Sequence, residues 1–344
     1  MKENRDQLTR REFLAKTSLG LLGAFVFPSA VLSQPNAPIQ GKGPRQGMGN
    51  LFLKNGKPIL AVAEGNNRSV RLRKGIEKIG GLEKLVKGKT VILKLNAVAP
   101  GPYPVSSDPD FVVSIGEAVI DSGAKKVSIY DSVSERMFQQ MGLYEKVKKS
   151  GIELLPKDGS FPEFFTPVEK TTWEVMKKID PSIHLIEADV VINVANCKRH
   201  GDAGFTCAMK NHFGSVYGPN RWEAHIKLHK GGSIDSKVVD ESFRIPFRKL
   251  AAEFSDAIRC EMTMIDAQDL LTKRGPMLDG AEIKKGVNKL IISGDIVATD
   301  AYCSRLMAEH DPTYSVDIWE PVLQYGERLG LGTADLKKTE IIEA

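Results

Sequence analysis

Short apolar segments alternate with segments of helical periodicity along most of the chain, and this alternation limits the folds that the chain can adopt. The expected strands cover residues 59–63, 90–95, 126–130, 152–155, 190–194, 262–266 and 290–293. The expected helices cover residues 69–79, 82–87, 108–122, 135–149, 181–187, 203–213, 238–258, 295–309 and 317–329. Strands joined by crossover helices form a mainly parallel sheet with helices on both faces. We therefore predict a three-layer α/β fold with the carboxyl ends of its strands along one edge.

The sequence divides into three segments. Residues 1–33 have the features of a signal peptide, residues 34–57 are rich in Pro, Gly and Gln and indicate a linker, and residues 58–344 form a single α/β domain. Within that domain, residues 156–180 follow no regular pattern and are expected to form a small irregular insertion.

The N-terminal segment resembles a twin-arginine signal peptide. Arg10 and Arg11 precede Phe13 and Leu14, and an apolar run with small residues behind it follows. The run is short and contains glycines, so we expect no stable membrane span after cleavage. An ordinary secretory signal or a basic helix is the alternative. The resemblance implies export of the folded protein by the twin-arginine translocase, to the periplasm or another extracytoplasmic space.

The charge of the chain does not indicate a nucleic-acid partner. The sequence has 48 Lys and Arg against 43 Asp and Glu, a formal net charge of +5, without a run of basic residues. Neither a G-x-G-x-x-G pattern behind a strand nor a G-x-x-x-x-G-K-[ST] pattern is present, so we find no nucleotide motif. The cofactor stays unidentified, and a metal ion is one alternative.

Polar residues follow the ends of several expected strands. Lys94 and Asn96 end the second strand, and Lys198 and His200 follow the strand that begins at Val190. A buried lysine is costly unless it is paired, so Lys94 indicates an ammonium group directed into a cleft. The alternative is a lysine that reaches solvent from the edge of the sheet.

The segment after His200 adds further polar side chains. In the expected helix over 203–213, Thr206 and Lys210 are four residues apart and share a face, and Asn211 is adjacent. Together with the strand-end lysines they predict a positive pocket for a carboxylate or a phosphate, although each charge alone is also typical of a solvated surface.

These patterns give each candidate residue an expected role. We assign catalytic roles to Lys94, His200 and Lys210, with His200 as the acid or base. The expected ligand-binding residues are Asn96, Lys198, Thr206, Asn211, Asp266 and Asp300. Of these, Asp266 or Asp300 would orient a lysine or the histidine, since both follow or lie near strand ends.

A metal site is the main alternative to the positive pocket. His225 and His229 are four residues apart, which is a metal-ligand spacing on a helix, although their surroundings also fit a strand or loop. The four cysteines, Cys197, Cys207, Cys260 and Cys303, contain no C-x-x-C pair. We expect buried free thiols, with a disulfide or a ligated cluster as alternatives.

Five short motifs resemble the family called domain of unknown function 362. They are K-L-N at 94–96, K-R-H at 198–200, T-C-A-M-K-N-H-F-G at 206–214, the strand end Met264-Ile265-Asp266, and S-G-D-I-V-A-T-D at 293–300. The resemblance covers roughly residues 58–335. Leu95 and Arg199 replace the family's usual Pro and Thr, but the Lys, Asn and His of those motifs are present. The chain lacks the ferredoxin-like module of some relatives, and the resemblance implies no particular reaction.

The sequence leaves three functions open. The first is an exported protein whose cationic cleft binds, and as an enzyme would transform, a small anionic molecule. The second is a metal- or iron–sulfur-dependent redox protein that is exported folded. The third is a non-catalytic binding or maturation factor for another exported protein.

Overall fold

The computed structural model describes residues 44–98, 101–229 and 241–344, without the side chains of 227–229 and 241–243. The chain divides into two units, residues 1–40 and 41–344, and all described residues belong to the second. The expected signal peptide over 1–33 therefore lies outside the described residues. Residues 44–57, expected as part of a linker, pack into the second unit: the buried Arg45 pairs with Glu261 at 2.7 Å.

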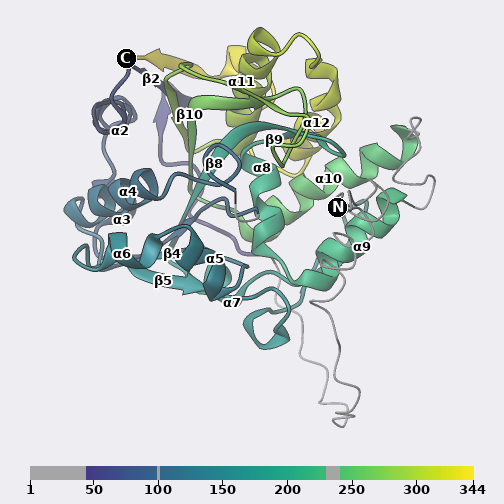
Figure 1. Ribbon diagram of the computed structural model, residues 1–344, viewed down its shortest axis with the longest axis horizontal. Coiled ribbons are helices and arrows are strands. Elements are labelled where there is room, and N and C mark those ends of the chain that lie inside the picture. The colour runs from purple at the N-terminus through teal and green to yellow at the C-terminus, as the bar shows by residue number, and fades with distance from the viewer. Residues whose placement is uncertain (1–43, 99–100, 230–240) are drawn as a thin grey trace, which may run out of the picture. The chain divides into compact units, whose positions relative to one another are not determined.

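A large central sheet organises this unit, and its main strands run in the order β1-β2-β12-β10-β8-β3-β4-β5 (Figure 1). Their bounds are β1 (Leu53–Lys54), β2 (Lys57–Glu64), β12 (Lys289–Ser293), β10 (Met262–Thr272), β8 (Val190–His200), β3 (Thr90–Lys94), β4 (Lys126–Asp131) and β5 (Glu153–Pro156). The five strands from β10 to β5 are parallel to one another. Three further strands pair with β8, β10 and β2: β9 (Gly204–Thr206), β11 (Glu282–Lys284) and β13 (Glu340–Glu343).

Helices cover both faces of the sheet, which confirms the predicted α/β class. One face carries α2 (Arg68–Lys78), α3 (Glu83–Val86), α4 (Pro109–Asp121), α5 (Glu135–Gln140) and α6 (Leu143–Val147). The other carries α8 (Ala208–Asn211), α10 (Glu241–Ile258), α11 (Ile296–His310) and α12 (Glu320–Arg328) (Figure 1). Strand β2 shows why two layers form: Leu60 and Val62 enter one core, whereas Ala61 and Ala63 enter the other.

The remaining elements are short. They are α7 (Ile183–Glu187), α9 (Gly218–His229) and the 3-10 turns η1 (Pro162–Phe164), η2 (His212–Ser215), η3 (Val316–Ile318) and η4 (Leu336–Lys338). The expected insertion contains a two-stranded sheet of β6 (Val168–Glu169) and β7 (Lys178–Ile179). Within the described part of the chain, every helix is too short or too polar to cross a membrane.

Capping residues begin the helices close to where the sequence places them. Asp108 accepts a hydrogen bond from the backbone N–H of Phe111, with Pro109 in the first turn of α4. Asp295 accepts one from Ala298 at the start of α11. The expected helix over 135–149 is instead divided into α5 and α6, because Gly142 adopts a φ of 73° that a continuous helix does not allow.

Strand β8 is longer than predicted, and this changes the geometry of the site. It continues through His200, and β9 folds back against it with Lys198 opposite Thr206. The predicted helix over 203–213 is therefore wrong: its first part is β9, and the helix begins at Ala208. Thr206 and Lys210 do not share a helix face. The hairpin forms in place of the helix, because β9 provides hydrogen-bond partners for the backbone of β8 where β8 extends beyond β3.

Glu253 on α10 ties the insertion to the helical layer. Its buried carboxylate accepts hydrogen bonds from the backbone N–H groups of Val175 and Met176, at 2.7 and 2.9 Å, and from the Tyr325 hydroxyl at 2.8 Å.

We predict that Glu253→Ala lowers the free energy of unfolding by about 3 kcal/mol or more, because three buried donors lose their acceptor. Urea denaturation measures this. The exposed Glu174→Ala is the control and should cost under about 1 kcal/mol; equal losses would contradict the prediction.

Candidate functional site

The candidate site lies where the chain reverses its direction of travel across the sheet. From β3 the chain adds β4 and β5 on one side, and it then returns to add β8 and β10 on the other. Strands β3 and β8 are parallel neighbours, so their carboxyl ends open at the same edge. Ligands of open α/β sheets bind at such a switch point.

A cavity of about 380 Å³ occupies this place. Its lining brings together most of the residues that the sequence singled out: Lys94, Asn96, Lys198, His200, Thr206, Lys210 and Asn211. Asp131, Phe213, Arg221 and His225 also line it. The lining thus contains the cations of three lysines and one arginine against the carboxylate of Asp131 alone.

Lys94 and Asp131 form a buried ion pair at the base of the cavity. The Lys94 ammonium donates to Asp131 Oδ2 at 3.0 Å and to the Leu95 carbonyl at 2.7 Å. Burial lowers the pKa of Lys94 and raises the pKa of Asp131, while their mutual attraction opposes both shifts. Gly214 makes the pair possible, because a Cβ there would lie 2.6 Å from Asp131 Oδ1 and 2.8 Å from Lys94 Nζ.

Three asparagines join the segments around this pair. Asn211 accepts a hydrogen bond from Asn96 Nδ2 at 2.8 Å and donates to Asn193 Oδ1 at 2.7 Å. Asn193 in turn donates to the Ala208 carbonyl. The amides therefore fix the end of β3, strand β8 and helix α8 relative to one another.

Lys198 is buried and held by two oxygen acceptors. Its ammonium donates to Asn96 Oδ1 at 2.6 Å and to the Val105 carbonyl at 2.5 Å. Burial lowers its pKa to about 7, and the neighbouring charges of Lys210 and Lys94 act in the same direction. Lys198 is thus an anchored cation whose charge changes near neutral pH.

Lys210 is buried without such anchoring. Within the described part of the chain its ammonium has no hydrogen-bond acceptor or ion pair. It lies 4.0 Å from the centre of the Phe213 ring, a cation–π contact. Burial lowers its pKa to about 8, and the charge of Asp202 opposes this shift. Lys210 is therefore the cavity lysine with capacity for a new anionic partner.

His200 is oriented by the turn between β8 and β9. Its Nδ1 accepts hydrogen bonds from the backbone N–H groups of Asp202 and Ala203, both at 3.2 Å. Burial and the charges of Lys210 and Lys198 lower its pKa well below the ordinary value. The ring is therefore neutral, with its proton on Nε2. This arrangement makes His200 a hydrogen-bond donor to the cavity, and the acid or base role expected from the sequence stays a prediction.

Thr206 and Arg221 complete the polar lining. The Thr206 hydroxyl is buried and has no hydrogen-bond partner among the described residues. Arg221 on α9 donates to the Ser132 hydroxyl at 3.0 Å. Sequence reasoning missed Arg221, because a single arginine on a short helix carries no local signal of where it points.

The two predicted aspartates lie outside the cavity lining. Asp266 contacts Arg68 at 3.0 Å, and burial raises its pKa to about 6. Asp300 accepts hydrogen bonds from the Ala208 and Met209 backbone and from the Trp319 indole. It thereby fixes the start of α8, so it positions Lys210 through the helix rather than by contact.

The proposed metal-binding pair of histidines falls partly outside the described side chains. His225 and His229 both lie on α9, but the side chain of His229 lies outside the described residues. His225 lines the cavity, packs edge-on against Phe213 and contacts the Arg221 carbonyl through Nδ1. No three potential metal ligands converge on the cavity among the described side chains.

Comparisons with known proteins identify relatives of this chain. The model of the family described as domain of unknown function (DUF362) matches residues 91–305. Thylakoid-associated protein sll1697 of Synechocystis sp. is 26% identical over 265 residues, which cover 76% of this chain and 74% of that protein. The lactate racemase apoprotein of Thermoanaerobacterium thermosaccharolyticum is a structural neighbour, with a TM-score of 0.45, 14% identity, and coverage of 67% of this chain and 53% of the racemase. This chain thus spans about half the length of that racemase.

The buried ion pair leads to a stability prediction. Lys94→Met should lower the free energy of unfolding by about 3–5 kcal/mol, because it leaves the Asp131 carboxylate buried and unpaired. The double variant Lys94→Met with Asp131→Asn should lose less, since no buried charge is left. Urea denaturation compares the two, and Lys87→Met, which removes an exposed ion pair with Glu83, is the control. A double variant no more stable than Lys94→Met would refute this role of the pair.

Proposed function

The chain belongs to the DUF362 family, and from the geometry of its cavity we propose that it binds a small anionic molecule bearing a carboxylate or a phosphate. The proposal rests on one observation above all: the buried Lys210 ammonium has no oxygen partner within the described part of the chain. A buried cation without a counter-ion is unfavourable, and an anionic ligand would relieve that cost.

The remaining lining supports an anion of modest size. The Thr206 hydroxyl lacks a partner in the described part of the chain, and the neutral His200 ring carries its proton on Nε2, so both can donate to a ligand oxygen. The excess of cations over the single carboxylate makes the cavity positive. A volume of about 380 Å³ lies at the lower end of ordinary small-molecule sites.

The same residues could also carry out proton transfer on the bound molecule. A lysine whose pKa lies near neutrality is deprotonated often enough to act as a base, and Lys198, with a pKa of about 7, meets this condition. The Lys94 and Lys210 ammonium groups would stabilise the bound anion and the negative charge that develops on it. The proposed reaction class is therefore proton abstraction from a carboxylate- or phosphate-bearing substrate.

The N-terminal segment supports export by the twin-arginine route as a further proposal. Arg10 and Arg11 followed by Phe13, Leu14 and a short apolar run are the features that support it. Cell fractionation of the full chain tests it: the variant Arg10→Lys with Arg11→Lys should stay in the cytoplasm as precursor. Unchanged export of that variant would refute the route without bearing on the cavity.

Anion binding is tested by calorimetric titration of the full chain with inorganic phosphate, succinate and sulfate. At least one should bind, and Lys210→Met should raise its Kd about ten- to a hundredfold, because a charge-assisted hydrogen bond is lost. Lys87→Met removes an equal charge from an exposed position directly after α3 and should leave the Kd unchanged. Equal weakening in both variants would assign the effect to net charge and contradict the proposal.

The pKa of Lys210 makes anion binding pH-dependent. An anion binds the ammonium form of Lys210, whose pKa is about 8. Binding at a pH above this value therefore requires that Lys210 take up a proton. The affinity for sulfate, whose charge is constant in this range, should fall by up to about tenfold per pH unit above pH 8. Lys198, His200, His225 and Asp202 also surround this region, so Lys210→Met is needed as control and should lose the dependence above pH 8. A slope that persists in that variant would exclude Lys210 as its origin.

A further inference from the structure

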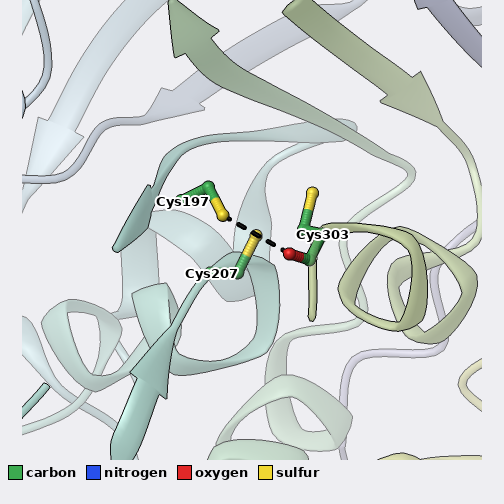
Figure 2. A group of neighbouring side chains, drawn as sticks. All are labelled: Cys197, Cys207 and Cys303. Carbon is green, nitrogen blue, oxygen red and sulfur yellow. Dashed lines mark hydrogen bonds between the residues drawn. The ribbon is translucent and has the colours of Figure 1, made fainter. Parts of the chain in front are cut away.

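Three of the four cysteines gather behind the cavity, in a group that the proposed function does not use. Cys197 lies on β8, Cys207 follows β9, and Cys303 lies on α11 (Figure 2). Their sulfur atoms all lie within 4.8 Å of one another, and all three side chains are fully buried. Cys197 contacts the Cys303 carbonyl at 3.6 Å through its sulfur.

The separation of the sulfurs suits a shared metal ion. A metal about 2.3 Å from each of three sulfurs holds them roughly 3.8–4.0 Å apart. The observed limit of 4.8 Å therefore requires adjustments of less than about an ångström, which a rotation of the side chains provides.

The ligand set selects the kind of ion. Thiolates prefer soft ions such as copper(I), zinc and iron–sulfur clusters. Structural zinc sites take four ligands and iron–sulfur clusters usually take four cysteines, but this group has three members among the described residues. Complete burial also leaves no ready path for water to act as a fourth ligand. Copper(I) has a filled d shell and accepts three thiolates without a fourth ligand.

We propose that Cys197, Cys207 and Cys303 form a three-sulfur binding site for copper(I). Each copper–sulfur bond replaces an S–H bond and releases its proton to solvent, so binding releases up to three protons and transfers no electron. The site shares no residue with the cavity lining, so the copper proposal does not rest on the proposed anion binding.

The position of the cysteines connects this site mechanically to the cavity. Lys198 and Thr206 face each other across the β8–β9 hairpin, and Cys197 and Cys207 are their immediate neighbours in sequence. Successive side chains on a strand point to opposite faces, so copper would bind on the reverse side of the hairpin that lines the cavity. A metal bond between these two cysteines and α11 would therefore brace the hairpin.

Anaerobic titration of the reduced full chain with copper(I), in competition with bathocuproine disulfonate, tests the proposal. We expect one ion per chain, a thiolate-to-copper charge-transfer band and a first shell of three sulfurs in X-ray absorption spectra. Cys303→Ser and Cys197→Ser should each weaken binding at least a hundredfold. Cys260→Ser is the matched control, because Cys260 lies outside the group and contacts Thr263, and it should bind as the unmodified chain does.

Several results would overturn the copper site. These are failure to compete with the chelator, equal weakening by Cys260→Ser, and a first shell containing nitrogen or oxygen. Tighter binding of zinc than of copper(I), in four-coordinate geometry, would also overturn it. So would a disulfide in the purified protein, which a count of free thiols under denaturing conditions would show as missing thiols. The X-ray absorption measurement uses the unmodified chain, so it decides the question even if a serine variant fails to fold.

Discussion

The amide of Asn211 is the contact on which the geometry of the cavity depends. It accepts from Asn96 beyond β3 and donates to Asn193 within β8, so a single buried side chain fixes two strands and its own helix. A buried amide is favourable only when its hydrogen-bonding groups have partners. Here the oxygen and the nitrogen of the Asn211 amide each find a partner in another segment of the site. The position of Lys210, one residue before Asn211, follows directly from this arrangement.

The cavity concentrates positive charge at the cost of folding stability. Lys94 is compensated by Asp131, and Lys198 by two neutral oxygens, but among the described residues Lys210 contacts only the rings of Phe213 and Phe247. Such local costs are typical of sites that bind a ligand, where the stability of the surrounding fold compensates for an unfavourable group. The three lysines therefore differ in how their charge is compensated, a difference that the sequence alone does not show.

The sequence predicted the fold class because strand and helix periodicities are local properties. Lys94 and Lys198 were found for the same reason: parallel strands bring their carboxyl ends to one edge, so any polar residue there is a neighbour of the others. Thr206 was placed in the cavity on wrong grounds, since β9 and not a helix carries it. The predicted helix failed because pairing with the end of β8 is a tertiary interaction that periodicity does not contain.

Other features could not be read from the sequence for related reasons. Asp266 ends its strand as expected, but it contacts Arg68, which comes from a helix nearly two hundred residues earlier in the chain. The position of Arg221 in the cavity lining and the grouping of Cys303 with Cys197 likewise depend on how the helices pack against the sheet. Distances between side chains from separate elements are set by packing, and single-sequence patterns describe only neighbours along one element.

The order of strands has a consequence for how the cavity forms in time. Strand β8 pairs with β3, although about a hundred residues separate them in sequence, and β10 joins only afterwards in chain order. Contacts over such distances require the closure of long loops, and the entropy of that closure makes folding slow. The walls around Lys210 are thus complete only in a chain whose distant segments have already paired, so the cavity belongs to the folded domain as a whole and to no single segment of it.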